Sequence, residues 1–255
     1  MFSRILLLTS LIAAAPAAAE ERLVYDIFSG TQVVGTREVV TTVLPAEPDL
    51  APETRLVTVT TKVDSRVAGL DYQLHSRADA RITSRKVSFV ASTQTNGETV
   101  EVQARQDRDG GWLVTAVTPG AVQELSYRSM EVDLTSVDLG DPVRQALLNP
   151  ARPSADVLLV ETGTVVEGAV RDLGEATLQV GDRRVAVSRV EWRPATGPIT
   201  LAWTAEGTLV SYDMRVLGST LTARLRALPA PPSWEGAEVS TDFTQPGTAI
   251  HEQEL

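Results

Sequence analysis

LDYQLHSRADAR, residues 70–81, is the stretch of sequence that decides the fold. Apolar or small residues stand at every even position from Leu70 to Ala80, and polar residues stand at every odd position from Asp71 to Arg81. A period of two is typical of a β-strand, because successive side chains point to opposite faces. One polar face and one apolar face predict an antiparallel sheet that is wet on one side.

The same alternation recurs along most of the chain, for example over residues 57–63, 199–203, 210–216 and 221–225. Turn-forming pairs such as Asn96-Gly97 separate these runs at short intervals. Long helical patterns are missing between them, which disfavours a βαβ fold. We therefore expect a mainly β protein with roughly a dozen strands. They should form one large, curved antiparallel sheet, a half-barrel or open barrel-like meander.

One short helix is expected in the middle of the chain. Asp141 can cap it, Pro142 suits its first turn, and the helix should continue from Val143 to Leu148. Residues 149–154 contain two prolines and predict a loop, which could separate two strand-rich halves. One continuous sheet is favoured, since single β domains often run past about 200 residues.

The N-terminus has the pattern of a secretory signal peptide over residues 1–19. Arg4 supplies the positive charge, an apolar run follows, and the small residues Ala17 to Ala19 predict cleavage before Glu20. The apolar run is shorter than the about 20 residues of a membrane span, and no later segment is long and apolar enough to be one. We expect a periplasmic or secreted protein.

Residues 20–228 are expected to form a single β-rich domain, and residues 229–255 a tail. The tail is rich in proline and in acidic residues and contains no Lys or Arg. Such a segment is expected to be mobile.

The composition excludes several classes of function. The chain has 255 residues, with 33 Asp plus Glu against 23 Lys plus Arg and a formal net charge of −10, which disfavours nucleic acid as a partner. It has no Cys and two His, so disulfides, thiolate catalysis and a lipid-modified cysteine are excluded and a multi-histidine metal site is disfavoured. We predict no metal and no cofactor.

One arrangement resembles catalytic chemistry, because His75 shares a strand face with Asp71 and Asp79. A carboxylate beside an imidazole can orient a general base. However, Ser76 points to the opposite face, and no Gly-x-Ser-x-Gly pattern occurs. A solvated polar face is the favoured interpretation, so we do not expect an enzyme, and a hydrolase is the weakest hypothesis.

The aromatic residues on the predicted strands indicate either a ligand cavity or an ordinary filled core. A large curved sheet with one short helix has little to cover its apolar face, and the two alternatives stay open. The residues expected to line a cavity for a hydrophobic molecule or lipid are Tyr72, Leu74, Trp203, Tyr212 and Met214.

Three groups of residues carry a resemblance to a known layout: Tyr25, Gly30, Val34-Gly35 and Val39-Val40; Glu161-Thr162-Gly163; and Trp203, Gly207, Thr208, Leu209 and Val210. Over about residues 22–228 the chain resembles secreted bacterial (periplasmic) proteins of an uncharacterised family, similar in layout to the lipoprotein-carrier half-barrel. The resemblance implies a long antiparallel sheet curled around an apolar ligand space. It supplies no catalytic residues.

The sequence thus predicts an exported, non-enzymatic protein that binds or carries a hydrophobic ligand or acyl group in a sheet cavity. The alternative is a structural or assembly partner of a cell-envelope complex with no small ligand. In that case the acidic tail or an unpaired sheet edge would contact the partner protein.

Overall fold

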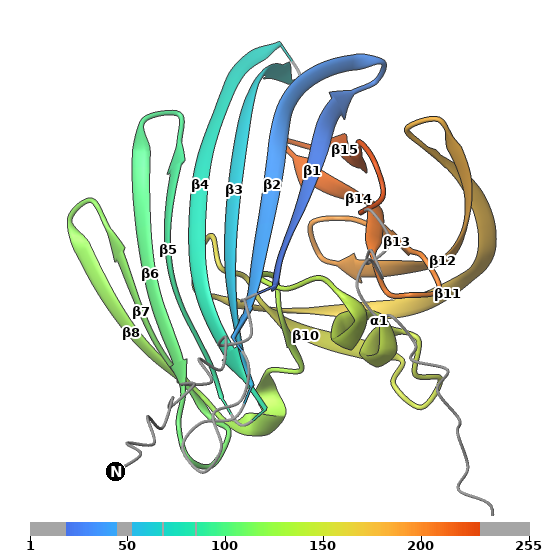
Figure 1. The fold of residues 1–255 in the computed structure, drawn as a ribbon. Helices are drawn as coiled ribbons and strands as arrows, with labels where there is room; N and C mark the ends of the chain where they lie inside the picture. The colour runs from blue at the N-terminus through green and yellow to red at the C-terminus, as the bar shows by residue number, and fades with distance from the viewer. Residues whose placement is uncertain (1–18, 45–52, 68, 85, 230–255) are drawn as a thin grey trace, which may run out of the picture.

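The computed structural model describes residues 19–44, 53–67, 69–84 and 86–229, which form one open sheet of fifteen strands (Figure 1). From one edge to the other the strands are β8 (Ala121–Tyr127), β7 (Trp112–Thr118), β6 (Glu98–Gln106), β5 (Val87–Thr95), β4 (Leu70–Thr83), β3 (Thr54–Val67), β2 (Gln32–Leu44), β1 (Ala19–Ser29), β15 (Ser219–Leu225), β14 (Leu209–Val216), β13 (Ile199–Trp203), β12 (Arg183–Pro194), β11 (Val165–Val180), β10 (Ser154–Leu158) and β9 (Leu134–Thr135). Strand pairs are antiparallel apart from the short parallel pair of β9 and β10. The curved antiparallel sheet predicted from sequence is confirmed.

The first and last strands join the two halves of the sheet. β1 pairs with β15 through a register in which Tyr25 lies opposite Leu225. Strands β1 to β8 therefore extend one way from this junction and strands β15 to β9 the other way. The chain forms one continuous sheet, as the sequence favoured over two separate halves.

The alternation of residues 70–81 appears directly in β4. Ala78 and Ala80 are buried on the inner face, whereas His75 and Arg77 are exposed on the outer face. The hairpin between β5 and β6 turns at Asn96-Gly97, where both residues have positive φ. That geometry matches the twist of the flanking strands and explains the Asn-Gly pair.

Residues 132–140, here called the crossing segment, pass over the concave inner face of the sheet. Val132 and Val137 from this segment are buried against Phe89 and Trp112 on the inner face of β5 and β7. The turn after β10 contacts the same face, because a Cβ added at Gly163 would lie 3.0 Å from the Val114 Cγ1 atom. The crossing segment and the turn after β10 therefore cover part of the inner face of the sheet.

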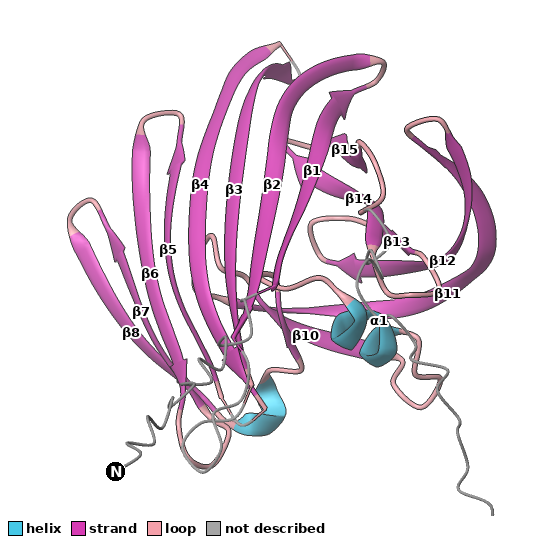
Figure 2. Cartoon of the chain, viewed as in Figure 1, coloured by secondary structure: helices cyan, strands magenta, loops and turns pink. Residues whose placement is uncertain are grey.

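Helical structure is sparse in the described residues (Figure 2): a 3₁₀ turn, η1 (Ser129–Glu131), and one α-helix, α1 (Asp141–Leu147). The helix prediction is correct in place, but the N-cap position is Gly140 rather than Asp141, and Leu148 is the C-cap. Val143 and Leu147 turn inward and join the core formed with β12 to β15.

The predicted signal peptide lies outside the described residues except for Ala19, and the predicted tail does so except for Pro229. In the described part of the chain, no helix has the length and apolar character needed to cross a bilayer.

Candidate functional site

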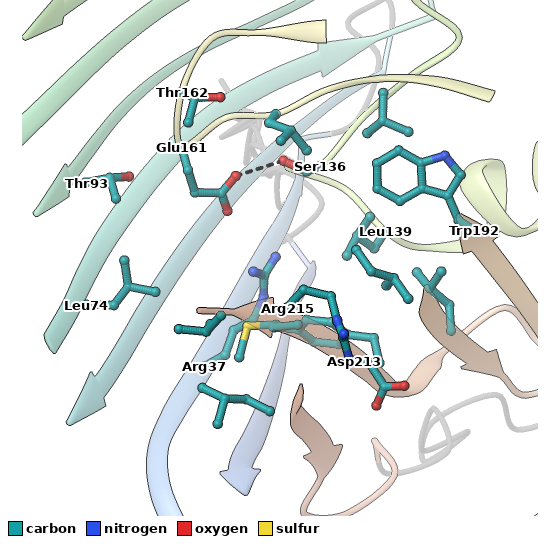
Figure 3. Close-up of a pocket in the computed structure, with 18 of the residues that line it drawn as sticks. Arg37, Leu74, Thr93, Ser136, Leu139, Glu161, Thr162, Trp192, Asp213 and Arg215 are labelled. Atoms are coloured by element: carbon teal, nitrogen blue, oxygen red, sulfur yellow. Dashed lines mark hydrogen bonds between the residues drawn. The ribbon is translucent and has the colours of Figure 1, made fainter. Parts of the chain in front are cut away.

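A cavity of about 360 Å³ lies between the inner face of the sheet and the segments that cover it (Figure 3). Its walls come from β2 to β6 on one side, from β12 to β15 on another, and from the crossing segment, α1 and residues 157–162. Most of the lining is apolar, and includes Leu74, Leu139, Leu147, Trp192 and Leu201. The size is within the range of about 300–1,000 Å³ that is usual for small-molecule sites.

Four of the five residues that the sequence analysis proposed for a ligand line this cavity. They are Tyr72 and Leu74 from β4 and Tyr212 and Met214 from β14. Two strands that are distant in the sequence thus face one another across one space. Whether these side chains contact a ligand stays a prediction.

Trp203 is placed elsewhere. Its side chain has no exposed surface, and its Nε1 atom donates a hydrogen bond of 2.7 Å to the carbonyl oxygen of Leu139. The register of β13 and β14 shifts between Ala202 and Trp203, just beyond the cavity-lining Leu201. Trp203 is therefore a core residue that is hydrogen-bonded to the crossing segment, and it does not line the cavity.

Arg37 is a cavity residue that the sequence reasoning missed. It lies on the inner face of β2 and is only 7% exposed, and its guanidinium carbon lies 5.4 Å from the centroid of the Tyr212 ring. One signal could have found it, because Arg37 is in alternation with Gly35 and Val39, so it interrupts the apolar face of a strand.

A row of polar side chains crosses the inner face at the level of Arg37. The ladder places Tyr25 opposite Arg37, Arg37 opposite Thr61, Thr61 opposite Ser76 and Ser76 opposite Thr93. The Ser76 and Thr93 hydroxyls are 3.0 Å apart and hydrogen-bonded. Hydroxyl groups are therefore next to the guanidinium in an otherwise apolar surface.

Glu161 brings a carboxylate to the same cavity from the turn after β10. Its Oε2 atom accepts a hydrogen bond of 3.3 Å from the Ser136 hydroxyl (Figure 3). Burial raises the pKa of the Tyr72 hydroxyl, and the negative charge of Glu161 raises it further. Glu161 and Arg37 thus bring opposite charges to the cavity from different elements, in addition to Asp213 and Arg215 of β14.

Tyr212 is influenced by the charges of both Arg37 and Glu161. Burial is the main cause of its raised pKa, the positive charge of Arg37 opposes that shift, and the charge of Glu161 adds to it. The Tyr212 hydroxyl is fully buried and makes no hydrogen bond of standard geometry among the described residues, although a hydrogen-bonding contact with the Arg37 guanidinium acts to lower its pKa. By contrast, the Tyr25 hydroxyl donates a hydrogen bond of 2.8 Å to the carbonyl oxygen of Leu209.

A second cavity, of about 330 Å³, lies on the other side of Arg37 and Leu139, which line both spaces. Its lining is more polar and includes Arg55 and Asp138, whose side chains form an ion pair. This ion pair fixes the crossing segment to β3. The segment and Arg37 together separate the two cavities.

His75 is on the opposite, outer face of the sheet and is exposed. The Asp79 carboxylate accepts hydrogen bonds from Arg77 and Thr58, and the Ser76 hydroxyl points inward to Thr93. His75, Asp79 and Ser76 therefore do not converge on one point. The described residues also contain no group of three or more His, Asp or Glu side chains placed to hold a metal ion.

The fold and the cavity define a class of proteins built on an open, barrel-like antiparallel sheet. One solved structure with this architecture is a beta-barrel-like protein with a domain of unknown function, DUF1849, from Brucella abortus. It matches with a TM-score of 0.53 and 14% sequence identity, over 81% of this chain and 95% of that chain. At this identity the likeness shows the fold alone. The chain matches no protein-family model and no curated protein.

Proposed function

We propose that this chain is an exported, non-enzymatic protein that binds or carries a hydrophobic ligand or acyl group in its central cavity. The observation that supports this function is the cavity of about 360 Å³ with its largely apolar lining. It lies inside a sheet whose cover consists of the crossing segment and a short helix.

Apolar lining that faces water is unfavourable, so a molecule that covers it gains free energy by burying apolar surface. A ligand with an apolar chain would provide that cover. Met214 in the lining has a flexible side chain that can adapt to chains of different shape. These properties favour a carrier or binding protein over a protein in which the sheet serves only as a scaffold.

Native mass spectrometry of protein purified from the periplasm, without detergent, tests the proposal. We expect a bound mass in addition to that of the polypeptide, and uptake of a neutral apolar dye. Leu74→Trp, which fills the cavity, should reduce both, whereas Leu113→Trp on the exposed outer face should not. A clean mass of the polypeptide alone together with no dye uptake would argue against ligand binding.

Export is the second part of this proposal and rests on the charged, apolar and small-residue pattern of residues 1–19. N-terminal sequencing of the purified protein should begin at Glu20. Recovery of a chain that retains Met1 in the cytoplasmic fraction would overturn this part.

A second candidate function is structural, as a partner in a cell-envelope assembly. It is favoured by the edge strand β8, which has one sheet neighbour in the described part of the chain and carries Val122 with 66% of its surface exposed. An edge of this kind can pair with a strand of another protein. Crosslinking should then recover one dominant partner, and deletion of residues 229–255 should weaken its recovery.

A further inference from the structure

We propose that the cavity ligand is an amphiphile with a single apolar chain and an acidic head group, and that Arg37 binds the acid. This inference rests on the proposed function, since it names the class of ligand held in the same cavity. The acid is a carboxylate or a phosphate, which a guanidinium recognises in the same way.

Arg37 is a buried cation without an ion-pair partner in the described part of the chain. Six other arginines in that part have carboxylate partners, and all six are more exposed than Arg37: Arg22, Arg55, Arg77, Arg152, Arg193 and Arg226. Arg37 has no ion-pair partner in that part although acidic residues outnumber basic residues in the chain. Burial of an unpaired charge opposes folding, so an anion supplied from outside would relieve the imbalance.

The surroundings of Arg37 provide further donors for an acid. Thr93 lines the cavity together with Arg37 and is itself buried. Its hydroxyl forms a pair with that of Ser76, and either atom of this pair can serve as the donor. The buried Thr61 is the hydroxyl residue next to Arg37 in the ladder, and the Ser76–Thr93 pair lies two and three strands away from Arg37 on the same face. Hydroxyl groups on the face that carries a guanidinium suit an oxyanion.

Asp213 and Arg215, which also line the cavity, are hydrogen-bonded to residues of their own hairpin. Asp213 accepts a hydrogen bond of 2.9 Å from Thr222, and Arg215 donates to Thr220 and to the carbonyl oxygen of Gly218. These two side chains are thus held by the β14–β15 hairpin. Arg37 is left as the cation available to a ligand.

Glu161 fixes the direction in which the ligand lies. Its carboxylate extends into the cavity from the turn after β10, whereas the Arg37 guanidinium enters from β2 (Figure 3). Two like charges repel in a poorly solvated space, so the acid must lie at Arg37 and away from Glu161. The apolar chain then extends along Leu139, Leu147 and Trp192.

The volume favours one chain over two. About 360 Å³ is near the lower end of the usual range for ligand pockets. In the second cavity beyond Arg37, Arg55 is already paired with Asp138, and Glu21 and Glu206 add negative charge, so it is a poor site for an acid. A single-chain fatty acid or lysophospholipid fits these limits.

The test is displacement of the neutral dye N-phenylnaphthylamine by dodecanoate, by dodecanoyl lysophosphatidic acid and by dodecanol. We expect at least one acid to bind the wild-type protein about tenfold or more tightly than dodecanol. Arg37→Met should raise the Kd of that acid by about tenfold or more and leave the Kd of dodecanol within about twofold. Whichever acid binds more tightly identifies the head group as carboxylate or phosphate.

Three variants sharpen this test. Glu161→Gln removes the repulsion and should tighten acid binding without affecting dodecanol. Arg77→Met on the exposed outer face is the matched control, since it removes an arginine outside the cavity, and it should change the acid Kd by less than about twofold. Arg37→Lys keeps the charge and should retain part of the acid preference, so it also serves if Arg37→Met does not fold.

The outcomes separate this inference from the function on which it rests. Equal affinity for acid and alcohol in the wild-type protein, or an acid preference that survives in Arg37→Met, overturns the acidic head group and leaves a neutral-ligand carrier standing. Failure of the dye and of all three amphiphiles to bind contradicts the carrier function itself.

Discussion

The guanidinium carbon of Arg37 lies 5.4 Å from the centroid of the Tyr212 ring, and both side chains are buried. They come from β2 and β14, strands on opposite sides of the β1–β15 junction. The pair therefore marks the point where the two halves of the sheet face one another across the cavity. Its energetics provide the first test of the structure.

We predict that Arg37→Met stabilises the ligand-free protein by about 1–3 kcal/mol. A buried ion loses several kcal/mol of hydration, whereas a desolvated cation–π contact contributes about 2 kcal/mol, so the loss of hydration is the larger effect. Urea denaturation measures the free energy of unfolding. The exposed Arg77→Met should leave it unchanged within the error of the measurement. A clear loss of stability in Arg37→Met would mean that the cation already has a compensating partner.

Two buried tyrosines should respond in opposite ways to loss of the hydroxyl. Tyr25→Phe removes the hydrogen bond to the Leu209 carbonyl oxygen and should cost about 1 kcal/mol or more. Tyr212→Phe removes a buried hydroxyl that makes no hydrogen bond of standard geometry among the described residues, so it should be neutral or stabilising. Thermal or urea unfolding of the two single variants compares them directly. Equal destabilisation by both changes would contradict the hydrogen-bond assignment.

The same tyrosines predict sensitivity to alkali. Burial is the main cause of the raised pKa of Tyr25 and of Tyr212 in the folded protein. Below pH about 10 both hydroxyls are protonated in the folded and unfolded chains, so their contribution to pH dependence is absent. Above it the unfolded chain releases protons that the folded chain retains, so stability falls as pH rises. Unfolding measured from pH about 9 to about 11 should show this fall, and the double variant Tyr25→Phe/Tyr212→Phe should flatten it.

The strands and hairpins could be predicted because their causes are local. The alternation of residues 70–81 is visible in the sequence, and so is the Asn96-Gly97 turn. The pairing of β1 with β15 joins segments about 200 residues apart, and no local pattern specifies it. The same holds for the crossing segment, whose position depends on what the concave face can bury.

The apolar residues of the candidate site could be predicted from the sequence, whereas its buried arginine was not predicted. Tyr72, Leu74, Tyr212 and Met214 belong to clear alternating strands, so their inward face follows from the period of two. Arg37 is flanked in sequence by Thr36 and Glu38, which is typical of a solvated segment. The alternation of Arg37 with Gly35 and Val39 is the one sequence signal for the buried side, and it is obscured by these polar neighbours. Trp203 could not be separated from the cavity residues, because the register shift beside it is a tertiary feature.

The ion pair of Arg55 with Asp138 should contribute more to the free energy of unfolding than an exposed pair on the outer face. Arg55→Leu removes the fixed contact between β3 and the crossing segment and should destabilise the protein by about 1–2 kcal/mol. Arg77→Leu, which breaks the exposed pair with Asp79, should leave stability nearly unchanged, because water screens that pair. A double-mutant cycle with Asp138→Asn isolates the pairwise energy of the first pair. Similar costs for both arginine variants would contradict a structural role for the crossing segment's ion pair.

Gly168 is required by the indole of Trp192, which forms part of the cavity wall. A Cβ added at Gly168 would lie 2.1 Å from the Trp192 Nε1 atom, which donates a hydrogen bond of 3.2 Å to the carbonyl oxygen of Ala155. Gly168→Ala must displace the ring and break this bond, so we expect a loss of about 1–3 kcal/mol and a shift in tryptophan fluorescence. Ala169→Val, at the exposed neighbouring position, should change stability by less than about 0.5 kcal/mol.

The decisive comparison is the combination of Gly168→Ala with Trp192→Phe. Phenylalanine lacks the Nε1 atom and is smaller, so it should leave room for the new methyl group. The double variant should therefore lose less than the sum of the two single losses, with a coupling of about 1 kcal/mol or more. Simple additivity of the two losses would show that the cost of Gly168→Ala does not come from the Trp192 indole.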